Sequence, residues 1–80
     1  MISGLQMRAA RSLLGLQQAD VAELANVSLA SVKRLETASE FRGAADTYWK
    51  IQIALEKAGV EFIPADDTKG PGVRLKQRQR

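Results

Sequence analysis

Two short segments with the helical spacing of hydrophobic and polar residues, 18–25 and 29–37, follow each other with only three residues between them. Their inward-facing apolar positions are Val21, Ala22, Ala25, Val32 and Leu35. Neither segment is long enough to form a stable helix alone, so their apolar faces must pack on each other and on a shared core. The spacing therefore predicts two helices joined by a tight turn.

The residues at this junction have the chemistry that such a turn needs. Asn26 tolerates the left-handed backbone conformation better than any residue except glycine. Val27 is apolar and fills the corner, and Ser28 is a good N-terminal cap for the second helix. Ala22 is small where the two helices cross, and a larger side chain there would push them apart. Together these positions predict a helix-turn-helix.

A first helix is expected over residues 4–14. Ser3, with Gln6 three residues later, has the spacing of a capping box at its start, and Gly15 is a suitable stop at its end. The expected apolar stripe consists of Leu5, Ala9, Leu13 and Leu16. We expect this stripe to face the core.

A fourth helix is expected after a loop over residues 37–45, with Asp46 as its cap and Gly59 as its stop. Its expected core residues are Tyr48, Ile51, Leu55 and Ala58. Trp49 and Ile53 form a separate apolar pair, four residues apart, on another face of the helix. That face is either covered by the core or makes a contact between two copies of the chain, because a tryptophan is the type of anchor that interfaces favour.

After the fourth helix the pattern becomes extended. Residues 60–63 predict a strand, and residues 73–75 predict a second short strand after a polar loop. Val60, Phe62 and Ile63 could also pair with the same element of a second subunit and so cover an exposed edge. The sequence thus offers two routes to a dimer and does not rank them.

The net charge of +3 is unevenly distributed. Residues 1–67 carry seven basic and nine acidic side chains, whereas residues 68–80 carry five basic side chains and no acidic one. The basic character therefore belongs mainly to the end of the chain and does not itself indicate a DNA-binding face. We divide the chain into a helix-turn-helix domain at 1–59, a strand pair at 60–76 and a basic, frayed tail at 77–80.

The composition excludes several kinds of site. The chain has no Cys and no His, which removes disulfides, thiolate zinc sites and the usual nucleophile–base pairs, so we expect no metal and no cofactor. Asp66 and Asp67 are adjacent carboxylates without a basic or metal-binding companion, and we interpret them as a solvated turn, not as part of an enzyme site. No apolar run approaches the roughly 20 residues that span a bilayer, so we expect a cytoplasmic protein.

The stretch from Ile2 to Gly59 resembles the helix-turn-helix domain of Cro and the phage repressors, the xenobiotic-response-element (XRE) family. Besides the motif itself, the matching features are Arg11, a Leu-Gly-Leu corner at 14–16, and Glu36 at the end of the second motif helix. The resemblance implies a mainly α, four-helix Cro/repressor-like domain. It also implies that Arg11 and Glu36 form a partly buried ion pair near the DNA backbone.

The chain departs from the family pattern at two positions. Gln17 stands where the family usually has Ser or Thr as a helix cap, and Asn26 stands where it usually has Gly. Both departures suggest a less stable variant of the motif. The final segments, AGVEFIP and GPGVRLK, are similar to those of a subgroup of very short bacterial regulators with a C-terminal β-strand pair.

The second motif helix presents a face of the right size and chemistry for the major groove of DNA. Its exposed residues are expected to be Leu29, Ala30, Lys33 and Arg34. Arg34 can form a bidentate contact with guanine, and Lys33 can reach guanine or a phosphate. Leu29 and Ala30 can pack against thymine methyls. The alternative is a solvated helix face, on which Leu29 simply covers the turn.

The resemblance also implies contacts with the DNA backbone. Gln18 matches a position whose side chain and helix N-terminus meet a phosphate. Arg42 matches a backbone-contacting position in the loop after the recognition helix, and Ser28 and, secondarily, Arg11 are further candidates. We expect a homodimeric, sequence-specific regulator of transcription that binds an inverted repeat in double-stranded DNA, most simply as a repressor, without a small-molecule ligand or a membrane. The alternative is a protein-interaction module such as an antitoxin or antiactivator.

Overall fold

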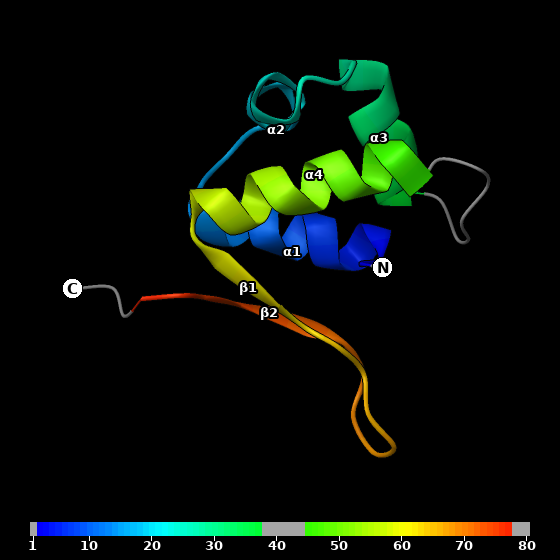
Figure 1. Ribbon diagram of the computed structural model, residues 1–80, viewed down its shortest axis with the longest axis vertical. Coiled ribbons are helices and arrows are strands. Elements are labelled where there is room, and N and C mark those ends of the chain that lie inside the picture. The colour runs from blue at the N-terminus through cyan, green and yellow to red at the C-terminus, as the bar shows by residue number, and fades with distance from the viewer. Residues whose placement is uncertain (1, 38–44, 78–80) are drawn as a thin grey trace.

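The computed structural model describes residues 2–37 and 45–77 (Figure 1). Its elements are the helices α1 (Gly4–Leu14), α2 (Gln18–Ala25), α3 (Leu29–Thr37) and α4 (Ala45–Ala58) and the strands β1 (Val60–Ile63) and β2 (Gly72–Leu75). The two strands pair antiparallel. The mainly α fold with a short strand pair is therefore confirmed. Figure 1 shows α1 and α4 side by side, α2 and α3 above α4, and the strand pair reaching away from the helices on the opposite side.

The helix ends follow the capping signals in the sequence. Ser3 Oγ accepts a hydrogen bond from the Gln6 backbone N–H at 3.2 Å, and Gln6 Oε1 accepts one from the Ser3 N–H at 2.9 Å, which completes the expected capping box. Gly15 closes α1 with a φ of 70°. Asn26 closes α2 with a φ of 58° and is the one non-glycine residue with a positive φ in the described part of the chain. The turn residue therefore has the predicted left-handed conformation.

The start of α2 agrees with the prediction, whereas that of α4 does not. At α2, Asp20 Oδ2 accepts the Gln17 backbone N–H at 2.8 Å, which is the half of a capping box that an acidic side chain in the first turn supplies. α4 already contains Ala45 and Asp46, so the prediction of Asp46 as its cap is wrong, and the helix begins two residues earlier than that cap implies. Asp46 instead lies in the first turn, where the helix dipole favours its charge, and pairs with Lys50 at 3.4 Å.

The core-facing side of α1 is not the one that the leucine spacing predicted. Leu5 and Leu13 are 72 % and 42 % exposed, and Ala9 is exposed as well. The side that faces the core consists of Gly4, Met7, Ala10 and Leu14. Gly4 explains this choice, because a Cβ atom there would lie 2.5 Å from the carbonyl oxygen of Leu35. The close approach of α1 to the end of α3 fixes the rotation of α1 and leaves Leu5, Ala9 and Leu13 in solvent, whereas Leu16, the last member of the predicted stripe, packs against the core.

One hydrophobic core joins the helices and the strand pair. Its buried members are Ile2, Met7, Ala10, Val21, Ala22, Ala25, Val32, Leu35, Tyr48, Ile51, Leu55 and Val60. Ala58, which was expected in this core, is exposed, whereas Val60, at the start of β1, is buried. Val60, one of the expected dimer candidates, is 0 % exposed, so its side chain belongs to the core of the single chain. Phe62 is only half-buried and packs against the core.

Besides this apolar packing, a buried polar side chain links the strand pair to α1. Gln6 is 7 % exposed, and its amide nitrogen donates to the carbonyl oxygens of Ile63 at 3.3 Å and Gly72 at 2.9 Å. Ile63 and Gly72 are partners at the same end of the ladder, so one amide holds both strands. The sequence indicated Gln6 only as half of a capping box, and this second role was not predicted.

Candidate nucleic-acid interface

The expected ion pair between Arg11 and Glu36 is present at the junction of α1 and α3. Arg11 Nε donates to Glu36 Oε2 at 2.9 Å, and Arg11 Nη2 donates to Glu36 Oε1 at 3.1 Å. The third nitrogen, Nη1, donates to the Leu16 carbonyl oxygen at 3.2 Å. The side chain of Glu36 is 2 % exposed and that of Arg11 is 24 % exposed. Arg11 is thus bonded through all three of its side-chain nitrogens.

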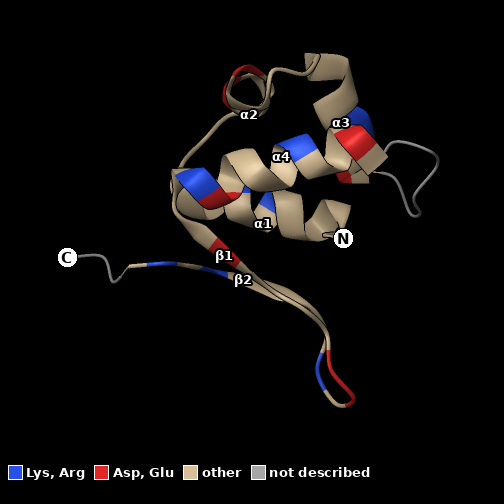
Figure 2. Ribbon diagram, in the orientation of Figure 1, with Lys and Arg blue, Asp and Glu red and all other residues tan. Residues whose placement is uncertain are grey.

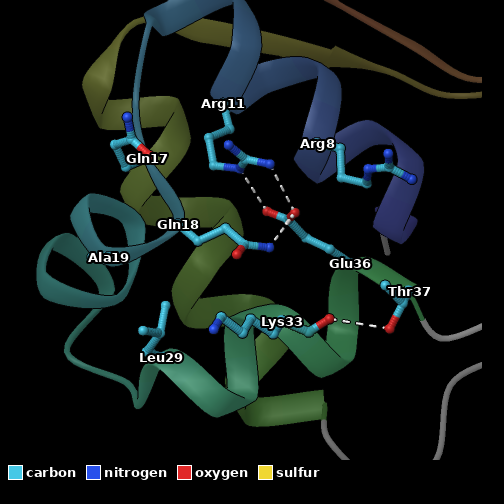
Figure 3. Close-up of a pocket in the computed structure, with 9 residues that line it drawn as sticks. All are labelled: Arg8, Arg11, Gln17, Gln18, Ala19, Leu29, Lys33, Glu36 and Thr37. Carbon is cyan, nitrogen blue, oxygen red and sulfur yellow. Dashed lines mark hydrogen bonds and ion pairs between the residues drawn. The ribbon is translucent and has the colours of Figure 1, made fainter.

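Gln18 extends this pair to the N-terminus of α2. Its amide nitrogen donates to Glu36 Oε1 at 3.0 Å, so Glu36 accepts hydrogen bonds from both α1 and α2 (Figure 3). The sequence assigned Gln18 to a phosphate, and the structure shows that one of its donors is already used inside the protein. The Arg11–Glu36–Gln18 network therefore fixes the mutual positions of α1, α2 and α3.

A groove of about 480 Å³ lies over this network. Its lining residues are Arg8, Arg11, Gln17, Gln18, Ala19, Leu29, Lys33, Glu36 and Thr37. They include three cations and one carboxylate, together with Gln17, Gln18 and Ala19 at the N-terminus of α2, where the helix dipole places partial positive charge. The groove is therefore electropositive. Along α4, by contrast, residues of both signs are interspersed (Figure 2), and no residue of α4 lines the groove.

The outer face of α3 matches the expected recognition surface. The exposed side chains there are those of Leu29, Ala30, Lys33 and Arg34. Val32 and Leu35 face inward and are buried. Lys33 and Arg34 make no ion pair with any residue in the described ranges, so their charges are free to meet an external anion.

The remaining backbone candidates have different environments. Ser28 Oγ accepts the Ser31 N–H at 3.0 Å, as a cap should, and donates to Ser31 Oγ at 2.8 Å. Its hydroxyl is therefore occupied within the protein. Arg42 lies outside the described residues, as do residues 78–80 of the expected basic tail. Arg8, which was not among the predicted site residues, lies three residues before Arg11, close to the same helix face, and this spacing is the signal that could have identified it.

The two adjacent carboxylates of the hairpin loop form a turn, as expected. Asp66 Oδ1 accepts the backbone N–H groups of Thr68 at 2.9 Å and Lys69 at 2.7 Å. These backbone hydrogen bonds, that of Thr68 first, lower the pKa of Asp66 below its ordinary value. In the described ranges, no three His, Cys, Asp or Glu side chains gather closely enough to hold a metal ion. No described helix has the length and apolar character of a membrane span.

No protein-family model and no curated protein matches this chain. The functional interpretation therefore rests on the geometry of the groove and of the exposed face of α3.

Proposed function

We propose that this protein is a sequence-specific DNA-binding regulator of transcription that inserts α3 into the major groove. The observation that supports this most strongly is the Arg11–Glu36–Gln18 network. It joins three helices beneath an electropositive groove and leaves the outer face of α3 unpaired. A recognition helix needs such a rigid support, because base readout depends on side chains held in register with the base edges.

Each exposed residue of α3 has a role that follows from its chemistry. Arg34 offers two parallel N–H donors that match O6 and N7 of guanine. Leu29 and Ala30 offer apolar atoms that suit thymine methyl groups. Lys33 lies both on this face and at the edge of the groove, so its ammonium group reaches either a guanine or a phosphate. Through these contacts with base edges, the four residues would distinguish one DNA sequence from another.

The groove beside α3 has the chemistry of a backbone site. A DNA strand that flanks the major groove would pass over the N-terminus of α2, where backbone N–H groups favour an anion. One N–H of the Gln18 side-chain amide is bonded to Glu36, and we assign the other N–H to this DNA strand. These contacts would hold α3 in place without reading bases.

The proposed active form is a homodimer on an inverted repeat, with two recognition helices about 34 Å apart. In Figure 3 the groove faces the viewer and α4 runs behind it. Neither Trp49 nor Ile53 of α4 lines the groove, so a two-fold contact through them would lie away from it. The exposed stripe on α1, Leu5–Ala9–Leu13, is a better candidate for a dimer contact that lets both grooves bind the same operator. It borders a second hollow that shares Arg8, Arg11 and Gln17 with the groove.

This α1 stripe is also self-complementary. Leu5 and Leu13 each lie four residues from Ala9, so an antiparallel contact centred on Ala9 brings Leu5 of one subunit to Leu13 of the other. The resulting dimer would occupy a promoter on the nucleoid in the cytoplasm and block polymerase. No ligand is required for this mechanism.

Selection of bound sites from random duplex DNA by the full-length protein tests the proposal. We expect enrichment of an inverted repeat with half-sites about one helical turn apart. Binding that is equal for all sequences, or absent, would contradict it.

A further inference from the structure

Arg8 is a cation of the groove that has no assigned role. It lies on the exposed side of α1 and lines the groove together with residues of α2 and α3. Figure 3 places Arg8 on the α1 side and Lys33 on the α3 side, with the Glu36 carboxylate between them. The two cations therefore flank the groove from two different helices.

The charges of the groove are not equivalent. The charge of Arg11 is balanced by Glu36 through two hydrogen bonds, and its third side-chain nitrogen is bonded to Leu16. Arg8, like Lys33, makes no ion pair within the described ranges. The positive potential that an incoming anion meets thus comes mainly from Arg8 and Lys33, and less from Arg11.

We propose that Arg8 is a DNA-backbone contact whose guanidinium group binds a phosphate on the side of the groove opposite Lys33. This inference rests on the proposed function. A guanidinium group presents paired N–H donors that match phosphate oxygens, and an exposed position on a helix lets the long side chain turn toward the strand. Because Arg8 belongs to α1 and not to α3, it positions the DNA without contacting base edges.

A phosphate contact has a signature that separates it from base reading. Each lost contact flattens the plot of log affinity against log salt concentration by about 0.9 for duplex DNA, and it weakens binding to all sequences alike. The experiment therefore compares Arg8→Ala with Lys57→Ala, which removes the same charge from an exposed position on α4, away from the groove. Alanine suits the interior of a helix, so both variants should fold, and thermal melting checks that they do.

Each protein is titrated, at several salt concentrations, against a random-sequence duplex and against the site selected by the wild type. We expect Arg8→Ala to lose about 0.9 from the slope for each subunit bound, to bind both duplexes more weakly by the same factor, and to select an unchanged consensus. Lys57→Ala should keep the wild-type slope, and Arg8→Lys should keep most of it, since the point charge remains.

Two outcomes would overturn the inference while the proposed function stands. In the first, Arg8→Ala has the same slope as Lys57→Ala, so Arg8 is a solvated cation. In the second, Arg8→Ala changes the consensus, so Arg8 reads bases. A wild-type protein that shows no preference for any duplex would instead refute the proposed function, and the inference with it.

Discussion

Glu36, with a side chain that is 2 % exposed, accepts two hydrogen bonds from Arg11, whose side chain is 24 % exposed. The two partners therefore differ in how easily water could reach the charge that is left when the other is removed. If Glu36 is removed, the guanidinium group of Arg11 can turn to water. If Arg11 is removed, a buried carboxylate keeps only its bond from Gln18. Stranding a buried charge is the more unfavourable of the two changes.

Removal of either partner should destabilise the fold, and removal of Arg11 should do so more. We expect Glu36→Ala to lower the free energy of unfolding by about 2 kcal/mol, and Arg11→Ala by about 3–5 kcal/mol. Urea denaturation measures both. The exposed pair Glu61–Arg74, with 2.6 Å between Oε1 and Nε, is the control, and Glu61→Ala should change the stability by less than about 1 kcal/mol. Equal effects of Glu36→Ala and Glu61→Ala would show that the network does not support the fold.

The amide of Gln6 should decide whether the strand pair stays on the helices. Gln6→Leu removes the donor to Ile63 and Gly72 together with the acceptor of the Ser3 N–H, so two carbonyl oxygens and one N–H must find water. We expect a loss of about 1–3 kcal/mol in the free energy of unfolding. We also expect the substitution to raise the rate of amide hydrogen exchange, relative to the wild type, more in β1 and β2 than in α2. Gln17→Leu, at an exposed position, serves as the control. Unchanged exchange in both strands would contradict the assigned role.

Arg34 should carry discrimination between base pairs. We expect Arg34→Ala to weaken binding to the selected site by about 1–3 kcal/mol and to relax the preference at one base pair in each half-site. Measurement of affinities for a set of single-base variants of the operator tests this. If Arg34→Ala weakened binding to every duplex equally, Arg34 would be a phosphate contact and the recognition surface would have to be redrawn.

The α1 stripe should hold the dimer that binds one operator. Leu5→Gln combined with Leu13→Gln places polar groups on exposed positions, so the monomer should remain folded while self-association weakens. Sedimentation equilibrium should show a larger dissociation constant, and binding to the full operator should approach binding to a half-site. Trp49→Gln, on the exposed face of α4, should leave both measurements unchanged. The opposite result for the two variants would assign the dimer to α4.

The local features of this fold could be predicted because each depends on a few neighbouring residues. The Ser3–Gln6 capping box, the stop at Gly15 and the left-handed turn at Asn26 each arise within one helix end. Hydrophobic periodicity then placed the helices and strands to within a residue or two. The Arg11–Glu36 pair could be expected only from the family resemblance, because nothing in the local pattern links residues 25 positions apart.

Packing decided the features for which the sequence offered equivalent choices. α1 has apolar residues on two sides, and the contact of Gly4 with α3 selected Met7 over Leu5 for the core. The link from Gln6 to the strands spans 57 and 66 residues, and no local pattern indicates it. Arg8 became part of a charged groove only when α1 was placed beside α2 and α3. Local hydrogen bonds follow from nearby residues, whereas the face that a helix buries depends on the shape of everything packed against it.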